Sequence, residues 1–224
     1  MKKWKVFLIA ILTISVLAVV AVSVWQRDNI GAVVKTVTNS SEEIAKEMND
    51  TKKKLEEELK KQNIDVVSDF TAEEEKQILK GELSVEDAVA NLTEKYKKTQ
   101  NKPTAANSSQ ADKLIGEKTV ELYSLKAYYL GQLGQMEKKV KADYVALPEE
   151  KKNFVGKKDI VNSYMSTAVG LMNQCDARVE KILAELKAGL EKLKADTSII
   201  KTIRSAYENE KNLKKAYYLS LLNE

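Results

Sequence analysis

The sequence predicts an all-α protein, in which an N-terminal transmembrane helix, a helical stalk and a short helical hairpin precede an up-down-up antiparallel three-helix bundle. Three observations support this fold class. Charged residues make up 31% of the 224 residues and aromatic residues only 6%, with two prolines, a composition typical of long helices with coiled-coil-like packing. The chain opens with a long uncharged run. In much of the remainder, apolar residues recur by threes and fours, which is the helical period.

The N-terminal segment has the length and flanks of a membrane anchor. No charged residue occurs from Val6 to Val24, and about 20 helical residues cross the roughly 30 Å hydrocarbon layer. Trp4 and Trp25 would stand about 31 Å apart in a helix, so we expect each at one membrane interface. These features predict a transmembrane signal-anchor over residues 6–25.

The flanking charges predict the orientation of this anchor. Lys2, Lys3 and Lys5 crowd its N-terminal side, and basic residues favour the cytoplasmic face. Residues 1–5 are therefore predicted to be a cytoplasmic stub, and the bulk of the chain is expected outside a cell membrane that it crosses once. The alternative is a secretory signal cleaved near Ser23, after which the protein would be secreted.

Charge and residue usage exclude several classes of function. Of the 37 basic residues, three precede the anchor, which leaves 34 against 33 acidic residues, so nucleic acid is not an expected partner. The chain has no histidine, and Ser-His-Asp triads and imidazole metal sites need one. Glycine-rich phosphate loops are absent as well. We expect no catalytic, cofactor-binding or metal site, and no enzyme. Cys175 is the only cysteine, so no internal disulfide forms.

Residues 26–63 form the predicted juxtamembrane stalk. Its apolar line is narrow and consists of Ile44, Met48, Leu55 and Leu59, which is too thin to build a globular core alone. Such a stripe suits a helix that pairs with another stripe, in this chain or in a second copy. A mostly solvated helical linker is the other interpretation.

Residues 69–98 predict a short hairpin of two helices, 72–80 and 85–98. Thr71 and Glu74 fit a capping box, Gly81 stands at a helix C-terminus, and Ser84 begins the next helix. The pattern L-x-G-x-L-S-x-E-D resembles small helical-hairpin modules at the ends of many bacterial membrane proteins. The hairpin is interpreted either as a protein-contact module or as a packing element. Residues 99–110, which include Pro103, predict a flexible linker.

Residues 111–224 predict three long helices joined by short turns, which implies antiparallel neighbours. The first runs from about Ala111 to Ala146. Pro148 is then expected in the first turn of the second helix, whose apolar residues alternate by four and three as a heptad seam. This seam comprises Val161, Met165, Ala168, Met172, Cys175, Val179, Ile182 and Leu186, continued by Leu190 and Leu193. Asp196 or Thr197 is the expected N-cap of the third helix.

The pentapeptide KAYYL occurs twice, at Lys126–Leu130 and at Lys215–Leu219. In an up-down-up bundle the first and third helices point the same way, so both copies would face the middle of the second helix. We expect one tyrosine of each pair to pack against sulfur. The predicted layer comprises Tyr128, Tyr129, Tyr217, Tyr218, Met165, Met172 and Cys175. A tyrosine-lined groove that holds a ligand or peptide is the alternative.

These features predict a membrane-anchored extracytoplasmic scaffold or protein-interaction protein of bacterial type. Its expected partners are the membrane and either another envelope protein or a second copy bound through the stalk. The alternative function is a sensory ectodomain that binds a ligand or peptide in the groove between the first and third long helices.

Overall fold

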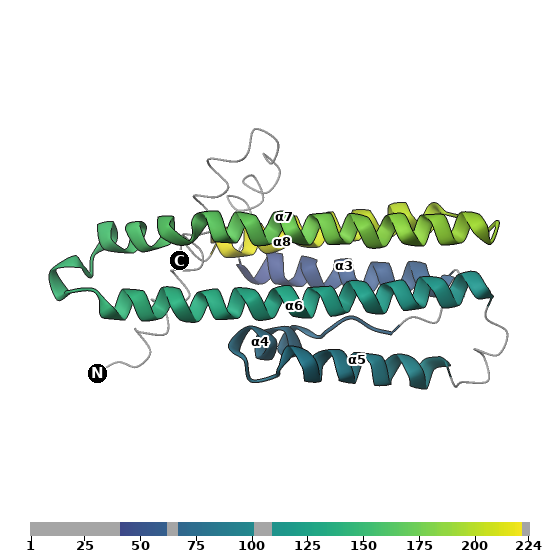
Figure 1. The fold of residues 1–224 in the computed structure, drawn as a ribbon, viewed down its shortest axis with the longest axis horizontal. Coiled ribbons are helices and arrows are strands. Elements are labelled where there is room, and N and C mark those ends of the chain that lie inside the picture. Colours follow the sequence, from purple (N-terminus) through teal and green to yellow (C-terminus); the bar gives the residue numbers. More distant parts are fainter. Residues whose placement is uncertain (1–40, 62–66, 101–108, 221–224) are drawn as a thin grey trace. The chain divides into compact units, whose positions relative to one another are not determined.

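The computed structural model describes residues 41–61, 67–100 and 109–220, and each element within them is helical (Figure 1). The elements are α3 (Ser41–Lys61), α4 (Ala72–Lys80), α5 (Val85–Gln100), α6 (Gln110–Ala146), the 3-10 turn η2 (Glu149–Lys151), α7 (Phe154–Lys192) and α8 (Ser198–Ser220). The all-α prediction is confirmed for these residues. The predicted stub, the anchor with Trp4 and Trp25, and most of the predicted linker lie outside them.

The chain divides into two compact units, and α3, α6, α7 and α8 contribute residues to both. Unit 1 takes in residues 1–48, 133–172 and 210–224. Unit 2 takes in residues 49–132 and 173–209. Among the described residues, no helix combines the length and the apolar character needed to cross a membrane.

Unit 2 holds the hairpin helices α4 and α5 against α6 (Figure 1). The apolar contact joins the extended segment before α4, both hairpin helices and one stripe of α6. Its buried members are Val67, Phe70, Ile78, Ala88, Leu92, Tyr123, Ala127 and Leu130. Gly131 of α6 is needed here, because a Cβ atom at that position would lie 2.5 Å from the Val85 side chain of α5. The hairpin is therefore packed into unit 2.

Two ion pairs join the long helices within unit 2. Lys118 Nζ of α6 lies 2.6 Å from Glu185 Oε2 of α7. Arg204 on α8 donates from Nε and Nη2 to the two carboxylate oxygens of Glu180 on α7, at 2.9 and 2.6 Å. The buried apolar side chains of α7 and α8 in unit 2 include Val179, Ile182, Leu183, Leu186, Leu190, Ile199, Ile200 and Ile203.

Unit 1 contains two smaller apolar clusters. In the first, Met136 and Val140 of α6 pack with Ile160 of α7. In the second, Ile44 of α3 packs with Leu213 and Ala216 of α8, and Met48 lies against them. Two residues of the stalk stripe, Ile44 and Met48, thus pack against α8 of the same chain in unit 1. Glu210 and Lys214 of α8 form an i,i+4 ion pair, with Nζ and Oε1 3.2 Å apart.

The hairpin caps agree with the sequence patterns. The Thr71 hydroxyl accepts a hydrogen bond from the backbone N–H of Glu74, and the Glu74 carboxylate accepts one from the backbone N–H of Thr71. Gly81 ends α4 in the left-handed region at φ 72°. The Ser84 hydroxyl accepts from the N–H of Asp87 at 3.0 Å. Asp196 caps α8 by accepting from the N–H of Ser198.

Two local predictions differ from the structure. Pro148 precedes the short turn η2 and not the first turn of α7, because the Asn153 side chain caps α7 by accepting from the N–H groups of Val155 and Gly156. Leu193 does not continue the buried seam. It is exposed, since α7 ends at Lys192 and the chain turns at Lys194, which has a φ of 55°.

The capping box supplies a test of local stability. Replacing Thr71 with Ala removes the side-chain acceptor for the backbone N–H of Glu74 in the first turn of α4. We expect the free energy of unfolding to fall by about 1 kcal/mol. Urea denaturation followed by circular dichroism measures this change. The matched control is Thr93→Ala, because the Thr93 hydroxyl only bonds back to the Val89 carbonyl within α5. An equal loss in both variants would contradict the assignment of the cap.

Candidate functional site

A cluster of two lysines and two carboxylates lies in the interior of unit 2. Lys52 Nζ of α3 and Lys126 Nζ of α6 lie 2.5 and 2.6 Å from Glu75 Oε1 of α4. Lys126 Nζ also lies 2.6 Å from Asp69 Oδ2, and Lys52 Nζ lies 3.8 Å from the same oxygen. The four side chains are only 5–14% exposed. We call them the ion cluster.

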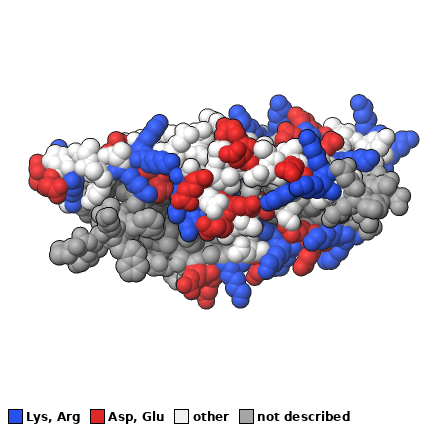
Figure 2. All heavy atoms as spheres, turned by 90° about the horizontal axis from the view of Figure 1, so that it is seen from below, with Lys and Arg blue, Asp and Glu red and all other residues white. Residues whose placement is uncertain are grey.

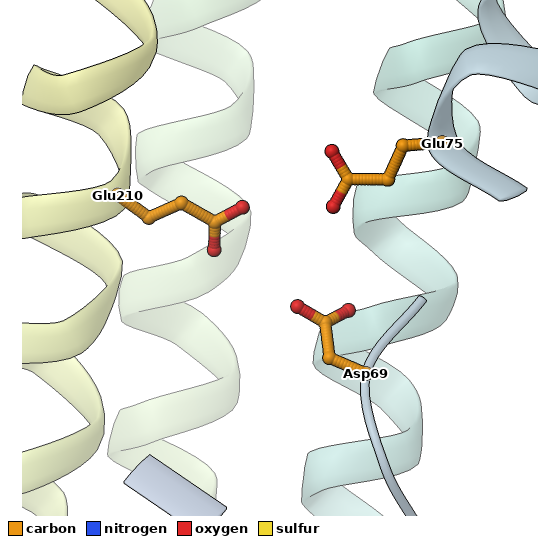
Figure 3. A group of neighbouring side chains, drawn as sticks. All are labelled: Asp69, Glu75 and Glu210. Atoms are coloured by element: carbon orange, nitrogen blue, oxygen red, sulfur yellow. The ribbon is translucent and has the colours of Figure 1, made fainter. Parts of the chain in front are cut away.

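The ion cluster also forms hydrogen bonds with the backbone of Phe70. Lys52 donates to the carbonyl oxygen of Phe70 at 2.9 Å, and Asp69 accepts from the N–H of Phe70 at 2.7 Å. Figure 3 shows the carboxylates of Asp69 and Glu75, which approach from the extended segment before α4 and from α4 itself. Glu210, also labelled there, belongs to unit 1. The ion cluster sets two carboxylates against two ammonium groups, an arrangement that suits a structural clasp.

A polar group around Cys175 lies on α7 in unit 2. The Tyr207 hydroxyl of α8 donates to Asp176 Oδ1 at 2.5 Å and lies 3.6 Å from Cys175 Sγ. Burial, and then the hydrogen bond to Asp176, raise the pKa of Tyr207 far above its ordinary range. Cys175 is half-buried. Within the apolar seam predicted for this helix, Cys175 is thus a half-buried member that also faces a phenol.

Tyr128 and Tyr129 of the first KAYYL copy take opposite environments. Tyr129 is 7% exposed, and Tyr128 is 39% exposed. Their rings meet edge to face, with centroids 5.2 Å apart and an interplanar angle of 88°. The guanidinium carbon of Arg178 on α7 lies over the Tyr128 ring, 5.4 Å from its centroid. The Tyr129 hydroxyl is buried without a hydrogen-bond partner among the described residues, and burial raises its pKa.

The predicted layer is distributed over both units. Tyr128, Tyr129 and Cys175 belong to unit 2, whereas Met165, Met172, Tyr217 and Tyr218 belong to unit 1. Met172 is half-buried, and the side chains of Met165, Tyr217 and Tyr218 lie outside the described part of the chain. The shared layer of both pentapeptides, and the groove proposed as its alternative, therefore stay predictions.

Sequence reasoning missed the ion cluster and Arg178. One signal pointed to Lys126: it follows the buried Tyr123 by three residues and precedes the buried Leu130 by four, which puts a lysine on an apolar stripe. No comparable signal identifies its partner, since Asp69 lies 57 positions away. Arg178 is one of only three arginines among the 37 basic residues.

Positive and negative side chains are interspersed on the molecular face shown in Figure 2. Among the described residues, the partners of a charge pair often share one helix: Lys98 pairs with Glu94 on α5, and Lys187 pairs with Glu191 on α7. Such exposed pairs contribute little to stability. The described residues on this face thus carry no extended field of one sign.

Comparison with known proteins supplies no relative: no family model, no curated protein and no solved structure matches this chain.

Breaking the ion cluster should destabilise the protein strongly. In Lys126→Met, Asp69 and Glu75 lose one of the two cations of the ion cluster, and removing one partner of a buried ion pair costs about 3–5 kcal/mol. Urea denaturation measures the loss. The control is Lys95→Met, which removes a more exposed pair with Glu74 and should cost at most about 1 kcal/mol. Equal losses would show that the ion cluster contributes no more than a surface pair.

Tyr207 should make stability fall at alkaline pH. Because the pKa of Tyr207 is raised in the folded protein, the fold favours the neutral phenol. That contribution is complete below the unfolded pKa of about 10 and declines as the pH rises above it. Tyr207→Phe should therefore lose less stability than the wild type between about pH 10 and 11.5 in urea titrations.

Tyr164→Phe is the matched control for Tyr207→Phe, because the Tyr164 hydroxyl also donates to a carboxylate, that of Asp143 at 2.7 Å, but on the surface. Tyr164→Phe should change the decline of the free energy of unfolding above about pH 10 less than Tyr207→Phe does. If Tyr207→Phe keeps the full wild-type slope, the buried hydroxyl does not carry this dependence.

Proposed function

We propose that this protein is a membrane-anchored, extracytoplasmic helical scaffold that acts by binding another envelope protein. One observation carries the proposal: the uncharged run from Val6 to Val24, bracketed by Trp4 and Trp25, with three lysines on its N-terminal side. A run of this length fits the hydrocarbon layer, and the lysines favour a cytoplasmic N-terminal side. The N-terminal segment is the anchor, and the chain after Trp25 is outside the cytoplasm.

The character of the exported part supports a binding role. Residues 111–224 form an up-down-up three-helix bundle in this proposal, preceded by the stalk and the hairpin. Long helices offer extended side-chain surfaces to partners, and the absence of histidine from the sequence removes the commonest general base. The proposal includes no catalytic activity.

Another envelope protein is a better partner than a second copy bound through the stalk. Ile44 of the stalk stripe is fully buried against Leu213 and Ala216 of the same chain, and Met48 lies beside it. An apolar side chain that is already covered gains nothing from a second copy. Self-association through these residues would require α3 to leave its own chain.

A ligand-binding ectodomain is the second candidate. The favouring observation is the buried Tyr129 hydroxyl, which lacks a hydrogen-bond partner among the described residues. Such a group costs free energy unless a polar partner reaches it. Tyr129→Phe separates the candidates: in a scaffold it should leave stability unchanged or raise it, whereas in a binder it should abolish ligand-induced stabilisation.

The anchor is tested by placing a charge at its centre. We expect the full chain to stay in the membrane pellet after alkaline carbonate extraction. Leu17→Arg should release much of it, because an arginine there costs about 2.5–3.5 kcal/mol in insertion. Leu17→Ala is the matched control and should stay in the pellet. A mature chain that begins after Ser23 would overturn the anchor and support secretion.

A further inference from the structure

Tyr128 and Arg178 form an exposed aromatic–cationic pair within unit 2. The Arg178 guanidinium carbon lies 5.4 Å from the Tyr128 ring centroid, and both side chains reach solvent. The Tyr128 ring also meets the buried Tyr129 ring edge to face. Because Tyr129 is held in the interior, the Tyr128 ring has a fixed support. The pair therefore presents a preorganised surface, which lowers the entropy cost of binding.

Arg178 lacks a carboxylate partner among the described residues. The acidic side chains nearest to it on α7 are each bound elsewhere: Asp176 by Tyr207, Glu180 by Arg204 and Glu185 by Lys118. The next cation along the same face, Lys181, is exposed one turn later. The hydrogen bond from Lys118 and, to a smaller extent, the nearby charge of Lys181 lower the pKa of the Glu185 carboxyl, whereas Arg178 has no such acidic partner among the described residues.

The use of arginine at this position is informative in a lysine-rich chain. Only Arg27, Arg178 and Arg204 are arginines. Arg204 uses its planar fork for a two-point contact with the Glu180 carboxylate, a geometry that lysine cannot reproduce. Arg178 has the same fork, but its ring contact leaves the N–H donors available. A guanidinium that lies over an aromatic ring and keeps its N–H donors available suits a ligand in which a carboxylate stands beside an apolar group.

We infer that the Tyr128–Arg178 pair is the anchor point for an acidic side chain of a partner protein. Arg178 donates two parallel hydrogen bonds to an Asp or Glu carboxylate, and Tyr128 covers the neighbouring apolar part of the partner. Tyr and Arg are the residue types most often found at the energetic centres of protein interfaces. This inference rests on the proposed binding function and names the surface and the chemistry of its partner.

Site-specific photo-crosslinking of the full chain in intact cells tests the inference. Benzoylphenylalanine replaces Gln174, an exposed residue one turn before Arg178 on α7. We expect capture of a partner peptide that contains Asp or Glu. Arg178→Gln should reduce capture by more than about tenfold, as expected when one member of a desolvated charge pair is removed. Capture by Arg178→Lys should lie between that of the wild type and that of Arg178→Gln, because lysine keeps the positive charge but lacks the two parallel donors of the guanidinium.

The controls separate a lost contact from a lost fold. Arg204→Gln, the matched variant, removes an arginine that is already neutralised by Glu180 and should leave capture at Gln174 within about twofold. Circular dichroism melting must be unchanged in Arg178→Gln. In addition, reversing the captured acidic residue to Lys should abolish capture, and Arg178→Glu should restore it.

Three outcomes would overturn the inference. Capture at Gln174 could be insensitive to Arg178→Gln, or the captured molecule could be a phospholipid and not a protein. In the third outcome, Gln174 captures nothing, while the same probe at Lys54 of α3 or Glu86 of α5 captures a protein. That last result would leave the proposed scaffold function standing, whereas no protein captured from any of the three positions would overturn both.

Discussion

The ion cluster is the interaction on which the arrangement of unit 2 depends. Lys52 and Lys126 approach from α3 and α6, and Asp69 and Glu75 from the hairpin side, so four segments meet at four charges. The surrounding apolar cluster supplies most of the favourable free energy but is non-directional. Charge-assisted hydrogen bonds are directional. We infer that the apolar contacts hold the hairpin on α6 and that the ion cluster selects its register.

The pentapeptide KAYYL shows how one helical stretch serves several environments. In the first copy Lys126 enters the ion cluster, Ala127 and Leu130 pack in the core, Tyr129 is buried and Tyr128 is exposed. In the second copy Ala216 is also buried, against Ile44 in unit 1. The 100° turn per residue places neighbouring letters on different faces. The first copy therefore gives α6 one buried edge and one accessible tyrosine, Tyr128, which lies beside Arg178.

Sequence patterns predicted the local features well and the charged interior poorly. The hairpin helices, the Thr71–Glu74 capping box and the turn at Gly81 were all predicted, because each depends on residues within four positions of one another. The start of α7 was misplaced, since Pro148 and Asn153 are both acceptable helix beginnings and only the Asn153 side chain makes the bonds. Lys52 and Glu75 lie in lysine- and glutamate-rich stretches that are typical of solvated helix faces, although their side chains are only 13% and 12% exposed.

The sequence by itself determined that the described chain is helical, where most helices begin and end, and which apolar stripes need cover. These properties follow from the helical period and from hydrogen bonds at helix ends, which are short-range. Only the tertiary structure decided which lysines are inside, which of two adjacent tyrosines faces solvent, and which arginine keeps its donors available. Those choices depend on side chains separated by tens of residues, such as Lys126 and Asp69 or Arg204 and Glu180. No local pattern specifies such pairs, because many lysines and glutamates in this chain are chemically equivalent until packing removes water from a few of them.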